Sequence, residues 1–253
     1  MDVKIYSVFH KPYWIPDDKV YVPIQVGFGS QIFNNNKPIL RDDNGFNISN
    51  RNKNYCELTA IYWIWKNCHH DYIGVDHYRR HFAESRIGKK KTIILKSERL
   101  VRLLSLNKVI LPKKRHYFIE TNYSQYCHAH HEIDLIKTRY ILEKDYPEYL
   151  ISFDYVMAKR SGHRFNMFIM PWHIFDSYCT WLFDIIFKLD DILDISTYNN
   201  YDSRVFGFVA ERLLDVYLIN NKIKILDMDY VFMDKEHLIR KYINFVKRKI
   251  KLN

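Results

Sequence analysis

Two kinds of apolar pattern alternate along the chain, and together they predict an α/β protein. Residues 3–10, "VKIYSVFH", alternate apolar and polar side chains and are rich in β-branched and aromatic residues, which predicts an opening strand. Short apolar runs predict further strands at 72–75, 109–114, 164–171 and 222–233. The order of strand, loop, helix and strand is typical of α/β layers.

Apolar residues at helical spacing fill the segments between these strands. Tyr55, Leu58, Ile61, Tyr62 and Trp65 predict one helix over 55–67 with an aromatic face. The same spacing predicts helices over 122–147, 172–190 and 204–221. Before the first helix lies a long polar stretch, 34–54, whose Asn and Asp residues can cap it. A helix start is also a natural site for an anion, and capping does not exclude that use.

The last residues differ in composition from the rest. From 236 to 253 the apolar residues Ile239, Tyr242, Ile243, Val246 and Ile250 fall on one side of a helix, with basic residues elsewhere. We therefore expect one domain over 1–235 and a basic amphipathic helical tail over 236–253. Such a tail is either a solvated face or an attachment to anionic lipid.

The charge of the whole chain adds the expectation of an anionic partner. Its formal net charge is +10, which fits nucleic acid, a phosphate-bearing ligand or an anionic membrane surface. The four cysteines are scattered and form no CxxC pair, so we expect neither a disulfide framework nor a zinc site. No signal-peptide pattern and no apolar run of bilayer length occurs in the sequence. A cytoplasmic protein, at most bound to the inner membrane surface, is the expectation.

Charged residues gather where the strand in "YIGVDHYRRHF" ends. Strand alternation would place Asp76 and Tyr78 on one side, His77 and Arg79 on the other, and Arg80 free in the loop. Ligands of open α/β sheets bind beyond the carboxyl ends of strands, and guanidinium groups match phosphate oxygens. The segment is therefore either a diphosphate site or a strand end closed by salt bridges.

Two other groups of residues have candidate chemistry. His128 and His131 of "HAHH", with Glu132 and Asp134 nearby, either share a metal or are exposed and capping side chains. The first alternative would describe a metal-dependent hydrolase. Glu211 lies beside Arg212 in an apolar helix, where it is either half of an ion pair or a general base.

Seven segments, in order from His10 to Leu218, resemble the DUF4422 family of bacterial capsular and exopolysaccharide glycosyltransferases. They are "HKPYWIP", "PIQVG", "RDDNGFNISNRNKNYCELTAIYWIWKN", "DYIGVDHYRRHF", "QYCHAHHEIDL", "NMFIMPWHIFDSYCTWLFDIIF" and "RVFGFVAERLLDVYL". The resemblance implies a GT-A-like open mixed sheet flanked by helices. It also implies a hexosyl transfer, from UDP-galactofuranose or otherwise UDP-galactose, to a lipid-linked glycan, with inversion at the sugar.

Many GT-A enzymes carry a DxD metal motif, where this chain has Asp76, His77 and Tyr78. A Mn²⁺ or Mg²⁺ requirement is therefore doubtful, and Asp76 is the only candidate ligand. Arg79 and Arg80 would then neutralise the leaving UDP.

From the residues and the resemblance together we assign roles to individual side chains. Glu211 is the expected acceptor base and Asp154 its alternate. Tyr13 or Trp14 would stack on a base or sugar, or pack in the core. We expect donor binding by His10, Asn54, Glu57, Asp76, His77, Arg79 and Arg80, and acceptor binding by His163 and Asn166. The rival from another class is a basic nucleic-acid-binding protein.

Overall fold

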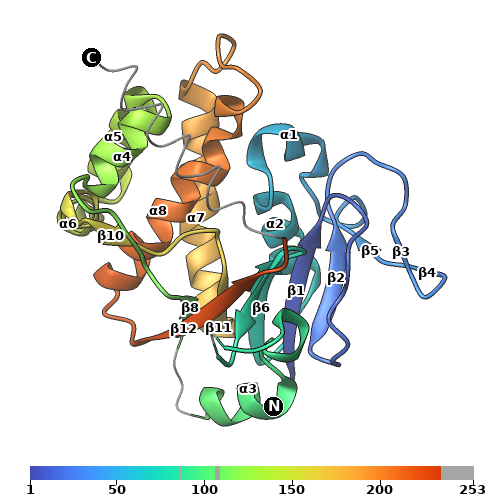
Figure 1. Cartoon of the computed structure of the whole chain (residues 1–253). Coiled ribbons are helices and arrows are strands. Elements are labelled where there is room, and N and C mark those ends of the chain that lie inside the picture. The colour runs from blue at the N-terminus through green and yellow to red at the C-terminus, as the bar shows by residue number, and fades with distance from the viewer. Residues whose placement is uncertain (86, 106–108, 235–253) are drawn as a thin grey trace, which may run out of the picture.

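The computed structural model describes residues 1–85, 87–105 and 109–234 (Figure 1). In this part of the chain a mixed sheet has the strand order β11-β8-β12-β7-β6-β1-β2-β5. Two small sheets, β3–β4 and β9–β10, stand apart from it. The strands are β1 (Val3–Phe9), β2 (Tyr21–Gln25), β3 (Phe33–Asn34), β4 (Lys37–Pro38), β5 (Leu40–Arg41), β6 (Tyr72–His77), β7 (Arg80–Ala83), β8 (Val109–Pro112), β9 (Arg115–His116), β10 (Ser161–Gly162), β11 (Phe168–Pro171) and β12 (Ile225–Phe232).

Strand β6 lies at the centre of the sheet and has different neighbours along its length. On one side it pairs in parallel with β1, which pairs in parallel with β2. On the other side it pairs antiparallel with β11 over Tyr72–Val75 and with β7 at His77. The carboxyl ends of β1, β2 and β6 therefore meet at one edge. The sequence analysis placed Arg80 free in a loop, and this was wrong. Arg80 is the first residue of β7 and pairs with His77.

Helices cover both faces of the sheet. They are α1 (Asn52–Tyr55), α2 (Leu58–Asn67), α3 (Ser97–Leu104), α4 (Asn122–Ala129), α5 (Glu132–Asp145), α6 (Leu150–Ala158), α7 (Trp172–Ile192) and α8 (Val205–Asn220). Successive strand residues enter opposite cores: in β8, Val109 and Leu111 pack with α7 and α8, whereas Ile110 packs with α3. Burial on both faces explains why these strands read as unbroken apolar runs.

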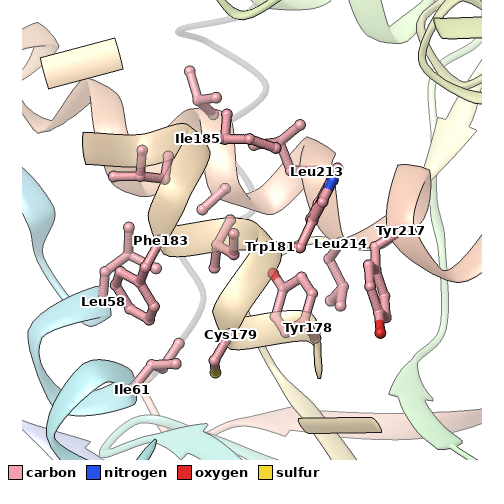
Figure 2. Packing of buried hydrophobic residues seen from close by; sticks show 14 of the residues in the cluster. Leu58, Ile61, Tyr178, Cys179, Trp181, Phe183, Ile185, Leu213, Leu214 and Tyr217 are labelled. Carbon is pink, nitrogen blue, oxygen red and sulfur yellow. The ribbon is translucent and has the colours of Figure 1, made fainter. Parts of the chain in front are cut away.

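The larger core is built around α7. Tyr178, Trp181 and Phe183 point from this helix toward its neighbours α2 and α8, as Figure 2 shows. The Phe183 ring stacks on Trp65 with a centroid distance of 5.8 Å. Trp181 packs on Tyr217 of α8 with a centroid distance of 5.5 Å, which positions α8, and the other face of α8 forms part of the candidate site.

The fold confirms the predicted α/β class, with a mixed sheet flanked by helices. Two helix predictions were wrong in detail. The helix over 55–67 is broken at Cys56, whose φ of 53° ends α1, and the helix over 122–147 is broken between Ala129 and Glu132. The tail over 236–253 lies outside the described residues. No helix in the described part of the chain is long and apolar enough to span a bilayer.

Candidate functional site

A cavity of about 650 Å³ opens where the carboxyl ends of β1, β2 and β6 meet. Val8, Val26 and the β6–β7 hairpin form its floor, and residues from α1, α4, α8 and β9 form its walls. Parallel strands direct their carboxyl ends to one edge, so this is the place where an open α/β sheet binds its ligand. The cavity has the size of a small-molecule site.

One face of α8 provides the longest wall. Arg204, just before the helix, and Gly207, Phe208, Glu211 and Arg212 all line the cavity. They are spaced by three and four residues, which places them on a single helical face. The opposite face of α8 packs against α7, so the helix cannot turn these side chains away.

The cavity wall carries far more positive than negative charge. Among the described lining residues the acids are Glu57 and Glu211. The lysines and arginines are Lys53, Arg79, Arg80, Arg115, Arg164, Arg204 and Arg212. Such a concentration of cations in a concave, partly desolvated surface attracts an anionic ligand.

Arg80 has no anionic partner among the described residues. Its guanidinium lies 4.4 Å from the centre of the Phe165 ring and 4.9 Å from that of Phe232. Within the described chain this guanidinium makes no hydrogen bond or ion pair, and its Nε atom is buried without a partner. Burial, followed by the charge of Arg79, lowers the pKa of this guanidinium. A ligand anion would relieve both effects.

Arg79 and His10 stand at the mouth of the cavity beside Arg80. The Arg79 guanidinium lies 3.5 Å from the Asp234 carboxylate, and both side chains remain partly exposed. The His10 ring meets the edge of Tyr78 at a centroid distance of 4.9 Å. Burial, with Lys11 and Arg79 nearby, lowers the pKa of His10.

His77 lines the cavity but does not add to its charge. Its Nε2–H donates to the carbonyl oxygen of Phe165. Burial, with the nearby charge of Arg80, lowers the pKa of His77 to about 4. The ring is therefore neutral at pH 7, and its Nδ1 atom has no proton to donate to a phosphate. His77 holds the Phe165 backbone in place, which is a different role from the predicted one.

A strained turn at Phe165 and Asn166 connects the residues of the site. Both have left-handed backbone conformations, with φ of 81° and 49°. The Phe165 N–H donates to Glu211 Oε1 over 3.1 Å, and Asn166 Nδ2 donates to Glu57 Oε1 over 2.8 Å. The turn therefore places both cavity acids, while the Phe165 ring packs on Arg80. Strained backbone held by several contacts is common at functional sites.

Glu211 combines the two alternatives that its sequence context left open. Its Oε2 accepts a hydrogen bond of 3.0 Å from Arg212, so the ion pair is present. The carboxylate also lines the cavity. Arg212 donates further to Phe208 O and Gln125 Oε1, and burial lowers its pKa.

Asp76 and Asn54 lie outside the cavity lining. The Asp76 carboxylate is fully buried, 2.6 Å from Ser7 Oγ and 2.8 Å from His81 Nδ1. It therefore does not offer oxygens to a metal in the cavity. Asn54 Nδ2 donates to Ser203 O instead. Its neighbour Lys53 lines the cavity, because successive residues of α1 point in different directions.

The structure also separates Asp154 and His163 from the cavity lining. Asp154 lies exposed on α6 and forms a bidentate ion pair with Arg139 at 2.9 and 3.0 Å. His163 is buried between the carboxylates of Asp215 and Asp227. Asn166 does not line the cavity itself, but its Nδ2 donates to two residues that do, Glu57 and Gly207.

The aromatic candidates near the N-terminus also have other partners. Tyr13 donates to Asp234 over 2.6 Å, and Asp234 raises the pKa of the Tyr13 phenol to about 12. Trp14 packs with its edge to His81 and lies 5.0 Å from Lys91 Nζ. Neither is among the cavity-lining residues.

The three histidines of "HAHH" have different partners. His128 pairs with Glu120, and His131 stacks on Tyr198. His130, between them in the sequence, lines the cavity and stacks on Phe208 at a centroid distance of 4.1 Å. No group of three or more potential metal ligands occurs among the described residues. Of the two alternatives for His128 and His131, the contacts of the described residues fit the one without a metal, because the helix ends at Ala129 between them.

Sequence reasoning missed four cationic residues of the cavity. Arg204 could have been found, because it continues the helical spacing of Glu211 and Arg212. Lys53 lies one residue before the predicted Asn54. Arg115 and Arg164 gave no local signal, since only the antiparallel pairing of β9 with β10 brings their segments together.

The family model for a domain of unknown function, DUF4422, matches residues 4–222. The chain belongs to the DUF4422 family. This confirms the resemblance inferred from the seven ordered segments. No curated protein matches this DUF4422 chain.

A solved structure resembles this DUF4422 chain over nearly its whole length. It is described as the apo structure of the bifunctional glycosyltransferase WbbM. The sequences are 32% identical and the TM-score is 0.84, over 93% of this chain and 46% of the WbbM chain. The DUF4422 chain thus spans less than half the length of that protein. The likeness confirms the predicted GT-A-like fold.

Proposed function

We propose that the protein is a glycosyltransferase that uses a nucleotide-sugar donor. The main support is Arg80, a half-buried guanidinium with no carboxylate partner in the described chain. It lies beside Arg79 at the carboxyl end of β6. A donor diphosphate would supply the missing anion. The likeness to a bifunctional glycosyltransferase over most of this chain supports the same reaction class.

In the proposed reaction, an acceptor hydroxyl oxygen bonds to C1 of the sugar while the bond from C1 to the diphosphate oxygen breaks. The electron pair of that bond leaves with UDP, whose growing negative charge is stabilised by Arg79 and Arg80. The acceptor proton passes to a carboxylate and then to solvent. Direct attack of this kind inverts the configuration at C1.

Glu211 is the proposed base. It lies on the cavity wall next to the turn that carries the Arg80 stacking partner Phe165. Glu57, held by Asn166, is the second cavity acid and our proposed contact to the donor sugar. Asp154 is not retained, because it is paired with Arg139 on the surface.

We also propose that the arginines, rather than a divalent cation, neutralise the leaving group. Two features support this: Asp76 is buried against Ser7 and His81, and the described residues contain no group of three or more potential metal ligands. Turnover should therefore persist in EDTA. Loss of turnover in EDTA and its recovery with Mn²⁺ would contradict this part of the proposal.

The family resemblance sets the finer substrate proposal. We propose UDP-galactofuranose as donor, with UDP-galactose as the alternative, and a lipid-linked glycan as acceptor. The reaction would take place in the cytoplasm at the inner membrane surface, and the basic tail over 236–253 would contribute to attachment. Turnover compared between the two donors, with the anomeric configuration of the product, tests these points.

The central experiment separates UDP binding from transfer. Arg80→Gln should weaken UDP binding about 10- to 100-fold, since a charged hydrogen-bond partner of the phosphate is removed. Glu211→Gln should retain UDP binding but lose transfer about 100-fold or more. Calorimetric UDP titration and a donor-consumption assay measure the two effects.

The matched control is Arg102→Gln, which removes an exposed arginine on α3, outside the cavity lining. Arg102→Gln should change neither UDP binding nor the rate of transfer. Undiminished UDP binding in Arg80→Gln would contradict the diphosphate role. A single-stranded oligonucleotide that stabilises the protein when UDP does not would favour the nucleic-acid rival instead.

A further inference from the structure

The cavity contains a second arginine group, made of Arg115, Arg164 and Arg212, to which the proposed reaction assigns no role. Arg115 lies on β9, Arg164 follows β10 and Arg212 lies on α8. Burial, followed by the charge of Arg164, lowers the pKa of Arg212, whereas Arg79 has the corresponding effect on Arg80. The arginines at the end of β6 and the second arginine group are therefore two separate concentrations of charge.

The segment that contains α8 faces two different walls of the cavity. Arg204, just before the helix, meets Cys56 of α1, with 3.0 Å between Nε and Sγ. Arg212 meets Gln125 of α4, because its Nη2–H donates to Oε1 over 3.0 Å. Figure 1 shows α8 between α1 and α4. The second arginine group therefore belongs to the α4 side of the cavity.

Arg164 is buried without a carboxylate partner in the described chain. It is 5% exposed, and its guanidinium donates to three neutral oxygens: Tyr117 Oη, His163 O and Asn122 Oδ1. The nearby acid Asp215 accepts bonds from His163 with both oxygens and forms no ion pair with Arg164 within the described residues. A buried cation without a counter-ion is costly, and a bound anion would reduce that cost.

Tyr117 connects Arg164 to Arg115. The guanidinium carbons of Arg115 and Arg164 lie 5.4 and 5.5 Å from the centre of the Tyr117 ring. Arg115 is exposed and has no ion pair in the part of the chain that the structure describes. Its guanidinium is therefore available to an anion from outside.

The acids around the second arginine group have other partners. Glu120 lies 2.6 Å from His128, and Asp202 lies 3.2 Å from His130. Neither of these acids lines the cavity. Glu211 does line it, and forms the ion pair with its neighbour on α8. One carboxylate thus stands against three guanidinium groups on this side.

We propose that the second arginine group binds an oxyanion of the acceptor, which is the carboxylate of an acidic sugar or a phosphate. Guanidinium groups match the oxygens of both in a bidentate way. Glu211 contacts both sides, because its Oε1 accepts from Phe165, which packs on Arg80, and its Oε2 accepts from Arg212. An acceptor hydroxyl at Glu211 would therefore lie between the donor diphosphate and the second arginine group.

An aromatic surface beside this group suits the sugar that would carry the anion. The His130 ring stacks on Phe208 and Tyr201, with centroid distances of 4.1 and 5.6 Å. All three rings line the cavity, and Tyr201 is 56% exposed. Exposed aromatic rings with polar edges can meet both the apolar face and the hydroxyl groups of a sugar.

This inference rests on the proposed function, because it names a property of the acceptor. The two can nevertheless fail separately. Titration of UDP alone tests the donor site. Titration of a second anion into the protein saturated with UDP tests the acceptor subsite, and neither measurement requires transfer.

Calorimetric titration of inorganic pyrophosphate into the UDP-saturated full chain is the test, and we expect one further binding site. Arg115→Gln should weaken pyrophosphate binding about tenfold, because a charged donor is removed, and its effect on UDP should be at least about fivefold smaller. Arg164→Lys should weaken pyrophosphate binding about threefold, since a lysine lacks the planar fork. Retained UDP binding shows that this buried variant folds.

The matched control is Arg160→Gln, which removes an exposed arginine next to β10 that does not line the cavity. It should leave pyrophosphate binding unchanged. Failure of pyrophosphate to bind the UDP complex would overturn the inference. So would an Arg115→Gln variant that loses UDP and pyrophosphate affinity equally, because Arg115 would then belong to the donor site.

Competition against pyrophosphate identifies the source of the oxyanion. Glucuronic acid and glucose 1-phosphate should each displace pyrophosphate at a lower concentration than methyl glucoside, which is neutral. The more effective of the two distinguishes a sugar carboxylate from a phosphate. Equal displacement by all three sugars, or by none, would overturn the assignment to an anionic acceptor.

Discussion

Burial lowers the pKa of two side chains in the β6–β7 hairpin, His77 and Arg80, with different consequences. The guanidinium begins from so high a pKa that it remains charged, and its stacking on Phe165 leaves its charge unneutralised. The imidazole begins near neutrality and becomes uncharged. Arg80 can therefore bind an anion, whereas His77 positions the backbone of Phe165.

The neutral His77 gives the protein a specific pH dependence of stability. Between pH 6.5 and about 4 the unfolded chain binds a proton at this residue and the folded chain does not. The contribution of His77 to the free energy of unfolding is thus fully present above pH 6.5 and is lost as the pH falls toward 4. The total loss is on the order of 3 kcal/mol. His77→Gln should show a smaller loss of unfolding free energy between pH 7 and 4.5. Urea denaturation at both pH values measures this, and equal losses in both proteins would contradict it.

At the scale of elements, the break between α1 and α2 decides which side chains reach the cavity. Cys56 has φ 53° and ψ −128°, a conformation that favours glycine. It lets Asn52, Lys53, Cys56 and Glu57 line the cavity, whereas a continuous helix would have turned some of them away. The Cys56 thiol accepts a hydrogen bond of 3.0 Å from Arg204, which ties the break to α8.

Replacing Cys56 tests whether strain is stored at this break. Cys56→Gly and Cys56→Ala both remove the sulfur and its bond to Arg204, but only glycine tolerates the backbone conformation. The Gly variant should be more stable than the Ala variant by about 1 kcal/mol, after the entropy of glycine in the unfolded chain has been allowed for. Urea denaturation of the two variants gives the difference. A more stable Ala variant would show that the backbone is not strained there.

At the scale of the whole molecule, half of the net charge of +10 belongs to residues 236–253, which contain six lysines and arginines and one glutamate. In the described part of the chain, the donor cavity brings together seven cationic side chains and two acids. Low-dielectric walls strengthen the field of these charges inside the cavity.

The charged cavity predicts how salt affects ligand binding. UDP affinity should fall at least roughly threefold between 0.05 and 0.5 M NaCl, because salt screens the attraction between arginines and phosphates. Uridine, which lacks the phosphates, should bind with nearly unchanged affinity over the same range. Calorimetric titration of both ligands measures the contrast. The same salt dependence for UDP and uridine would argue against diphosphate binding in this cavity.

The sequence by itself determined the layers of this protein and one wall of its site. Apolar runs marked the strands that are buried on two faces, and apolar residues at helical spacing placed Glu211 and Arg212 on one helix. Both patterns can be read from the sequence because they depend on local backbone geometry. The cluster at the end of β6 was found for the same reason.

The tertiary structure decided which charges are neutralised. Asp76, Asp154 and His163 met partners distant in the sequence, whereas Arg80 met only aromatic rings in the described chain. Strand pairing also brought Arg115 and Arg164 to the cavity from segments without any local signal. Electrostatic partners are set by distance in space, and a single sequence records only neighbours along the chain.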